Sequence, residues 1–328
     1  MGAAAELAQF SRHGGRIAAA RAAFPGAPEP WLDLSTGVNP RPYPARGASR
    51  AARTRLPDPE ALQALEAAAA AYFGASPERV AATPGSEAAI RFLPHLLGAR
   101  RVALSPDTYG GHAESWRAAG AEVVADSDPQ AADAWVVVNP NNPDGATTAR
   151  ESLLASAQTR WTIVDEAFGE VAPDLSVAPQ AGGRLVVLRS FGKFFGLPGL
   201  RLGFVIAEPS LIAGLRGRLG EWPLSADAIA AGLQAYADVA WAARTRDRLA
   251  RLARRLDRVL AGGGLAAAGG TDLFRLVTAD DAHGVFRRLA AAGILCRPFP
   301  DPRRLRFGLP GRAADLRRLA AALSGDRR

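Results

Sequence analysis

The chain has 328 residues, of which 40 are basic and 32 acidic, so its formal charge is +8. This length allows a large core, in one large domain or two lobes, and the single cysteine, Cys296, excludes an internal disulfide framework. No apolar run approaches the roughly 20 residues needed to cross a bilayer, and the first residues lack the pattern of a secretory signal. We therefore expect a cytoplasmic protein without a membrane partner.

The basic composition raises the question of nucleic-acid binding. However, the densest arginine groups, in residues 244–258 and 312–328, alternate with Leu and Ala, which is typical of the solvated faces of amphipathic helices. The sequence shows neither zinc-ligand spacing nor basic residues interleaved with aromatic ones. We expect no nucleic-acid partner and no metal, and a small anionic ligand for the inner arginines.

The first two thirds of the chain predict an α/β fold. An Ala-rich segment over 60–73, closed by Gly74, predicts a helix, and a second helix is expected over 86–97. Helical patterns then alternate with short, continuously apolar runs, which indicates a mostly parallel sheet covered on both faces. We expect an antiparallel strand over 203–206. The predicted strands are residues 102–104, 123–125, 135–138, 162–164 and 185–188.

The last third predicts a smaller α+β lobe. A long helix is expected over 226–260 and a glycine turn over 262–264. A β-α-β-β-α pattern follows, with strands over 273–277, 294–296 and 305–307 and helices over 281–292 and 312–323. We expect a large domain over 46–225, a small domain over 226–328, and an N-terminal segment, residues 1–45, that packs with the small domain.

Lys193 is the only lysine of the chain. A guanidinium stays protonated, whereas a primary amine can lose its proton and form a Schiff base with an aldehyde. Solvated lysines seldom have Phe, Phe, Leu and Gly as neighbours, as this one does in Phe-Gly-Lys-Phe-Phe-Gly-Leu. Lys193 is therefore a candidate anchor for pyridoxal phosphate (PLP).

Further candidate residues follow the predicted strands, at the sheet edge where α/β folds bind ligands. Asp165 follows 162–164, Ser190 follows 185–188, and the Asn-Pro-Asn-Asn-Pro-Asp-Gly segment 139–145 follows 135–138. Gly85 and Ser86 open a helix, whose free amides and dipole suit a phosphate.

Taken in order, these motifs resemble the fold-type-I PLP enzymes of the aspartate aminotransferase superfamily. The likeness is greatest to the branch of the histidinol-phosphate aminotransferases and the threonine-phosphate decarboxylases, and it covers nearly the whole chain. It extends to segments 13–17 (His-Gly-Gly-Arg-Ile), 32–40, 188–194, 198–203 and 222–225. The fold implied is a large domain with a mostly parallel seven-stranded sheet and a small α+β domain.

The resemblance implies a role for each matching residue. Lys193 would bond PLP and move protons, Asp165 would pair with the pyridine nitrogen, and Asn142 would donate to the phenolic oxygen. Tyr109 would stack on the ring, and His112 would support Asp165. The alternatives are a helix cap for Asp165, an Asn-Pro turn for Asn142 and ordinary packing for Tyr109 and His112.

Two further sets of residues would hold the anionic groups of cofactor and substrate. In a chain this rich in arginine, either of the two proposed substrate-binding arginines, Arg306 and Arg297, could instead have no role in the site. His13 is proposed because glycines follow it directly. The cofactor phosphate would be held by Ser86, Ser190, Arg201 and the amides of Gly85 and Ser86, with Glu87 also among the cofactor-binding residues, and the substrate would be held by Arg306, Arg297, His13, Gly14 and Asn39.

Three residues depart from the pattern of the aminotransferases. Phe168 replaces a Tyr that donates to the ring oxygen, which favours decarboxylation over transamination. Gly192 replaces a Ser or Thr before the lysine, and Leu56 replaces a Tyr that reaches the partner subunit's phosphate. Two missing donors, at about 1 kcal/mol each, would weaken PLP binding by about tenfold or more.

The expected activity is decarboxylation of L-threonine O-3-phosphate to (R)-1-amino-2-propanol O-2-phosphate, for the cobalamin side chain. The alternative is transamination of histidinol phosphate or a related amino acid, and a third hypothesis is a non-enzymatic protein with the same fold. The resemblance also implies a homodimer.

Overall fold

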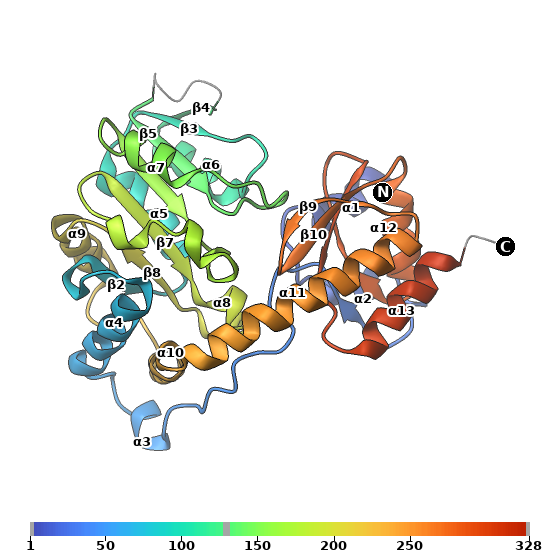
Figure 1. The fold of residues 1–328 in the computed structure, drawn as a ribbon, viewed down its shortest axis with the longest axis horizontal. Helices are drawn as coiled ribbons and strands as arrows, with labels where there is room; N and C mark the ends of the chain where they lie inside the picture. The colour runs from blue at the N-terminus through green and yellow to red at the C-terminus, as the bar shows by residue number, and fades with distance from the viewer. Residues whose placement is uncertain (1–2, 127–131, 326–328) are drawn as a thin grey trace. The chain divides into compact units, whose positions relative to one another are not determined.

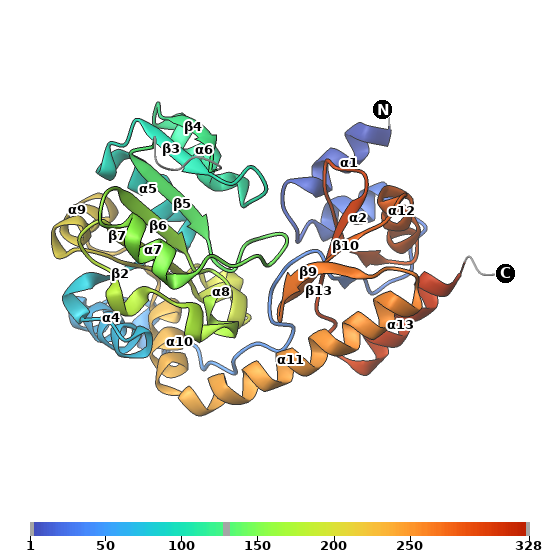
Figure 2. The same cartoon turned by 45° about the horizontal axis from the view of Figure 1, so that its top comes forward.

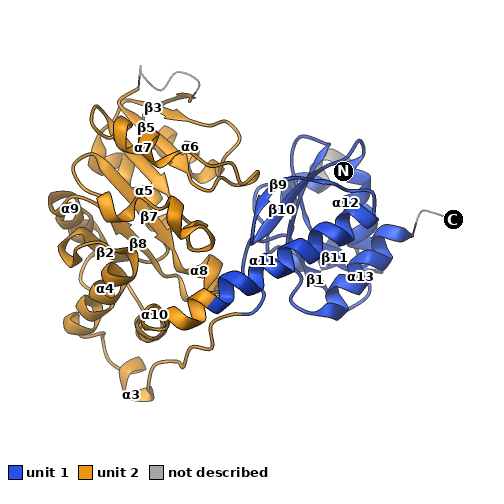
Figure 3. Ribbon diagram, in the orientation of Figure 1, with its two compact units in different colours: residues 1–41, 244–328 blue, residues 42–243 orange. Residues whose placement is uncertain are grey.

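The computed structural model describes residues 3–126 and 132–325. The chain forms two compact units (Figure 3): unit 1 comprises Met1–Arg41 and Arg244–Arg328, and unit 2 comprises Pro42–Ala243.

Unit 2 is built on a seven-stranded sheet with the order β2-β8-β7-β6-β5-β3-β4. Only β8 runs antiparallel to its neighbours among these described strands, which confirms the predicted α/β fold and the predicted antiparallel strand. Figure 1 shows the sheet with helices on both sides. In sheet order the strands are Val80–Thr83, Gly203–Ile206, Leu185–Ser190, Trp161–Asp165, Ala134–Val138, Arg101–Leu104 and Glu122–Ala125.

The two faces of this sheet are covered by different helices. On one face α5 (Ser86–Leu97), α6 (Gly110–Ala118) and α9 (Pro209–Leu219) form a core with strand residues such as Ile163 and Leu188. On the other face lie α4 (Pro59–Phe73), α7 (Arg150–Ser156) and α10 (Ala226–Ala237), with α10 packed on α4. The short helices α3 (Arg50–Arg53) and α8 (Phe191–Phe194) complete unit 2.

Unit 1 combines the two ends of the chain. Strand β1 (Leu32–Asp33) pairs in parallel with β11 (Ile294–Leu295), and a four-stranded sheet has the order β12-β13-β10-β9. In that order its strands are Arg297–Pro298, Arg304–Gly308, Phe274–Thr278 and Ala267–Thr271. The helices are α1 (Ala3–Ser11), α2 (Ile17–Ala23), α12 (Ala282–Ala291), α13 (Ala313–Ser324) and the greater part of α11 (Val239–Gly262), whose residues up to Ala243 belong to unit 2. Figure 2 shows α11 as the longest of them.

The helix expected over 226–260 is in fact two helices, because Asp238 interrupts the helical conformation. This residue leaves the helical conformation, with φ −95° and ψ 67°. Its carboxylate accepts a hydrogen bond of 2.8 Å from the amide of Trp241 and so caps the first turn of α11. The boundary between the two units lies at 243/244, whereas the expected domain boundary was 225/226. Helix α10 belongs to unit 2, where it packs on α4.

A cluster of aromatic side chains packs around α8 and the residue that follows it. Phe195 stacks on Phe191 with ring centroids 4.5 Å apart and on Trp241 with centroids 5.7 Å apart. Tyr236 of α10 meets Phe195 edge to face at 5.3 Å. Aromatic pairs add about 0.5–1.5 kcal/mol each beyond their buried area, so the turn after β7 rests on a rigid base. No described helix is both long and apolar enough to span a bilayer.

We expect Glu66→Ala to lower the free energy of unfolding by about 2–4 kcal/mol. Glu66 is 5% exposed. It accepts from the amide of Ala82 at 2.9 Å and from Arg216 Nη2 at 2.6 Å, so its loss leaves a buried amide unsatisfied. Urea unfolding measures the change, with Glu78→Ala, at an exposed position, as the control. Equal stability of the two variants would contradict this account.

Candidate active site

The carboxyl ends of β5, β6 and β7 bring several predicted residues together in unit 2. Asp165 ends β6 and is 3% exposed. Its Oδ2 lies 2.9 Å from Nε2 of His112, on α6, and its Oδ1 accepts from the amide of Ala167 at 2.9 Å. Both carboxylate oxygens are thus held, one by the His112 ring and one by the backbone.

Tyr109 precedes α6 and is held by the first turn of α5. Its hydroxyl donates to Glu87 Oε2 at 2.9 Å. Burial, together with the charge of Glu87, raises the pKa of Tyr109 above its usual value, so the phenol stays neutral. Arg91 Nε also donates to Glu87 Oε1 at 2.9 Å, so both oxygens of the Glu87 carboxylate accept hydrogen bonds.

Asn142 lies in the loop after β5 and is buried. The preceding residue, Asn141, joins this loop to the one that carries Tyr109. Its Oδ1 accepts from Thr108 Oγ1 at 2.6 Å, and its Nδ2 donates to the carbonyl of Asp107 at 2.8 Å. The loops after β3 and β5 are therefore tied together.

Lys193 lies on α8, directly after β7, and is half-buried. Its Nζ is 5.8 Å from the centre of the Phe168 ring, in the loop after β6. Phe168 is buried, so an apolar ring stands beside the lysine where aminotransferases are expected to have a Tyr.

Backbone from three segments converges at the first turn of α5. A Cβ at position 203 would lie 2.3 Å from the amide nitrogen of Ser86, and a Cβ at position 85 would lie 2.5 Å from Arg201 Nη2. Gly203 also pairs with Ser190 across β7 and β8. Arg201 has φ 54°, the only positive φ of a non-glycine residue in the described ranges, and such strain concentrates at ligand sites. Amides, hydroxyls and a guanidinium thus form a cradle suited to a phosphate.

Gly192 is explained by close packing. A Cβ at this position would lie 2.8 Å from Cα of Pro198, so a Ser or Thr would collide with backbone. The missing hydroxyl is therefore accompanied by a tighter turn beside Lys193.

The predicted substrate-binding arginines lie in unit 1 and face each other across β12 and β13. Arg297 pairs directly with Arg306 in the antiparallel register. Arg306 is 4% exposed and donates to the carbonyl of Ser35 at 3.0 Å. Burial, and then the charge of Arg297, lowers the pKa of Arg306 well below its ordinary value. Opposed like charges destabilise a sheet, so this pair favours a bound anion.

Ser35, which we did not predict, connects this pair to the N-terminal glycine segment. A Cβ at position 14 would lie 2.3 Å from the carbonyl oxygen of Ser35, and the amide of Gly15 donates to Ser35 Oγ at 2.7 Å. The contact explains the glycine at position 14. The available signal was the position of Ser35 in segment 32–40, which the resemblance had already singled out.

The remaining predicted residues of unit 1 differ in exposure. Asn39 is 2% exposed, and its Oδ1 accepts from the amide of Arg41 at 2.9 Å. His13, beside Gly14, is exposed. In unit 2, Leu56 is 63% exposed, which is unusual for a large apolar side chain.

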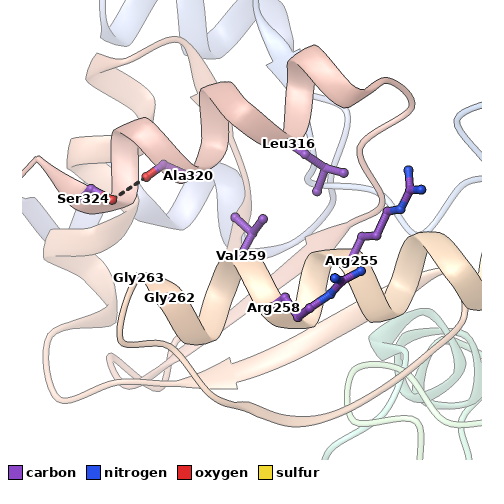
Figure 4. A pocket seen from close by; sticks show the side chains of 8 residues that line it. All are labelled: Arg255, Arg258, Val259, Gly262, Gly263, Leu316, Ala320 and Ser324. Atoms are coloured by element: carbon purple, nitrogen blue, oxygen red, sulfur yellow. Dashed lines mark hydrogen bonds between the residues drawn. The ribbon is translucent and has the colours of Figure 1, made fainter.

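Unit 1 also has a hollow of about 450 Å³. Figure 4 shows it between the end of α11 and α13, with Arg255 and Arg258 on one side and Leu316 on the other. It contains none of the predicted site residues. In the described ranges no group of three or more His, Cys, Asp or Glu residues is placed to hold a metal ion.

Residues 30–323 match the family of class I and II aminotransferases, and the chain belongs to this family. Within it, the chain is 44% identical over 327 residues to a threonine-phosphate decarboxylase of Sinorhizobium sp., with 95% of this chain and 97% of the relative covered. The threonine-phosphate decarboxylase of Pseudomonas aeruginosa is 40% identical over 325 residues, with the same shares covered. The resemblance inferred from the motifs is thereby confirmed.

Solved structures share the fold. The histidinol-phosphate aminotransferase of Sinorhizobium meliloti, in complex with pyridoxal-5'-phosphate, has a TM-score of 0.80 at 21% identity and covers 94% of this chain and 93% of its own. The L-threonine-O-3-phosphate decarboxylase of Porphyromonas gingivalis has a TM-score of 0.75 at 18% identity, over 90% and 98% of the two chains. The predicted fold class is confirmed.

We expect Gly192→Ser to weaken PLP binding rather than strengthen it. The added atoms collide with Pro198, and overpacking of this kind costs about 1–3 kcal/mol, which corresponds to about 5- to 150-fold in affinity where it opposes binding. Titration of the apoprotein with PLP, followed by visible absorbance, gives the dissociation constant. Gly199→Ala in the same turn is the control, because a Cβ there meets no described atom within 4 Å. Tighter binding by Gly192→Ser would show that the absent hydroxyl, and not space, limits affinity.

Proposed function

We propose that the chain is a PLP-dependent decarboxylase that converts L-threonine O-3-phosphate to (R)-1-amino-2-propanol O-2-phosphate, a step of cobalamin biosynthesis. The observation that carries this conclusion is the identity of 44% and 40% to threonine-phosphate decarboxylases over 95% of the chain. The site geometry agrees with it.

The residues of unit 2 fit PLP. The cradle formed by Gly85, Ser86, Ser190 and Arg201 is open because Gly85 and Gly203 lack a Cβ, and it suits the cofactor phosphate. Lys193 would bond the aldehyde carbon, and Asp165, supported by His112, would pair with the pyridine nitrogen. When bound, PLP supplies the electron sink that accepts the electron pair of a broken bond at Cα.

The protein's own groups supply charge and proton transfer. The Asp165 carboxylate, held at both oxygens, would keep the ring nitrogen of a bound PLP protonated. Lys193 Nζ would be the group that delivers a proton to Cα once CO₂ is lost. Asn142 and Tyr109 would hold the ring from its edge and its face, and Phe168 beside Lys193 excludes water.

The choice of the bond to be broken depends on orientation. A substrate with both a carboxylate and a phosphate needs separate cationic groups for the two. We assign these groups to Arg306 and Arg297, together with the segment of His13 and Gly14 and with Asn39. These groups would orient the carboxylate so that its bond to Cα is the one broken, whereas transamination would require the Cα–H bond to be oriented in this way.

The resemblance also supports further proposals. We propose a cytoplasmic homodimer, in which the exposed Leu56 and the exposed Trp222, at 63% and 52%, lie near the contact with the second copy. We propose that neither a membrane nor a nucleic acid is a partner.

Product analysis tests the reaction. With PLP and L-threonine O-3-phosphate, and without a keto acid, the purified protein should release CO₂ and aminopropanol phosphate, and Lys193→Ala should release neither. Conversion of histidinol phosphate that depends on 2-oxoglutarate, with no CO₂ formed, would replace the proposal by an aminotransferase. Relatives of that name are also found, for instance in Stenotrophomonas maltophilia at 29% identity.

Arg306→Met should separate stability from function. Because Arg306 is buried and faces Arg297, its replacement removes a desolvated charge, so the unfolding midpoint should not fall. A lost hydrogen bond to a charged group costs about 1.5–3 kcal/mol, so kcat/KM should fall by about 10- to 100-fold. Thermal unfolding and initial rates give both numbers, with Arg304→Met on the same strand as the control. Full activity of Arg306→Met would remove Arg306 from the substrate site.

A further inference from the structure

Two charged residues lie next to the site in sequence but on the opposite face of the sheet. Glu166 follows Asp165, and Arg189 precedes Ser190. Side chains alternate between the faces of a strand, and Asp165 is paired with Leu188, so Asp165 and Ser190 share the face of α6. Arg189 points to the face of α4, where its guanidinium lies 4.7 Å from the centre of the Phe73 ring.

These residues form a buried ion-pair network. Arg189 Nη1 binds Glu166 Oε2 at 2.6 Å, and its Nη2 binds Glu170 Oε1 at 2.9 Å. Glu166 also accepts from Ser176 Oγ at 2.6 Å and from the amide of Val177 at 2.7 Å. Glu166, Glu170 and Arg189 are each at most 4% exposed.

The side chains of this network are closely packed. A Cβ at position 169 would lie 3.0 Å from Arg189 Nη1 and from Cβ of Glu166, so the guanidinium packs against the backbone of the loop. Burial raises the pKa of Glu170, and the neighbouring Arg189 opposes that shift. Buried, hydrogen-bonded charges of this kind fix geometry even where they add little stability.

The loop held in this way carries groups of the site. Glu166 and Glu170 flank Phe168 in the sequence, and the Phe168 ring faces Lys193 Nζ at 5.8 Å. The amide of Glu166 donates to the carbonyl of Leu188 at 2.9 Å, which extends the pairing of β6 with β7 one residue beyond Asp165. Arg189 therefore ties the loop after β6 to the strand that leads to Lys193.

We propose that Glu166 and Arg189 are positioning residues: from the far face of the sheet they hold Asp165 and Phe168 in place against Lys193. The inference rests on the proposed use of PLP, and it adds to that proposal a pair of residues that contacts neither cofactor nor substrate.

The test compares matched variants as holoenzymes. Glu166→Gln keeps the shape of the side chain but removes the charge that Arg189 binds. Ser176→Ala removes one hydrogen bond from the same carboxylate without leaving a charge unpaired. Glu66→Gln is the control, since Glu66 is also buried and also binds an arginine, Arg216, at 2.6 Å, but it is remote in sequence from the cofactor residues.

The readouts are the PLP dissociation constant, the pH at which the visible absorption band has changed by half (its pH midpoint), and kcat and KM as separate values. Glu166→Gln should raise the dissociation constant about tenfold and shift the midpoint upward, because Asp165 then supports the ring nitrogen less well. Its kcat should fall more than its KM changes. Ser176→Ala should shift the midpoint in the same direction by less, and Glu66→Gln should lower the unfolding temperature without moving the midpoint.

An unchanged midpoint in a folded Glu166→Gln protein would overturn the inference. If that variant does not fold, Ser176→Ala decides, and an unchanged midpoint there has the same meaning. An equal shift in Glu66→Gln would also overturn it, because general loss of stability would then explain the effect. Absence of the visible band in the unmodified protein would instead refute the use of PLP. Formation of transamination products would change the proposed reaction but not the outcome of this test.

Discussion

The parallel pairing of β6 with β7 is the constraint on which the rest of the site depends. Asp165 lies opposite Leu188, and α8 with Lys193 begins directly after Ser190. On the other side, β8 places Gly203 opposite Ser190, and Gly203 in turn touches the amide of Ser86. A slip of one residue would move every side chain to the other face of the sheet. Backbone hydrogen bonds thus locate the carboxylate, the amine and the phosphate cradle together.

Much of unit 2 could be predicted because its strands are continuously apolar and its polar residues directly follow them. Asp165, Ser190 and Lys193 are evident for this reason. Strands β2 and β9 gave no such pattern, since Val-Ala-Ala-Thr and Ala-Ala-Gly-Gly-Thr have little that distinguishes them from helix or loop. The break at Asp238 also escaped prediction, because a single capping aspartate interrupts an otherwise uniform helical composition.

The interactions that sequence reasoning missed are those that join distant segments. Glu166 and Arg189 are 23 residues apart, and each reads as an ordinary charge at a strand end. Ser35 meets Gly15 from 20 residues away and Arg306 from 271 away. Such contacts are set by tertiary packing, which local propensity does not encode. In unit 1 the result is a pair of like charges, one buried (Arg306) and one half-buried (Arg297), a local conflict of the kind that folds retain where a ligand is bound.

The half-buried Lys193 has a consequence for handling the protein. It is the only side-chain amine in the chain, so amine-directed reagents have a single side-chain target, which lies in the site itself. Acylation or reductive alkylation therefore marks site occupancy by a single mass increment at one peptide, apart from modification of the α-amino group. The same fact removes lysine as an attachment point for immobilisation or dye coupling on the surface, where the cations are arginines.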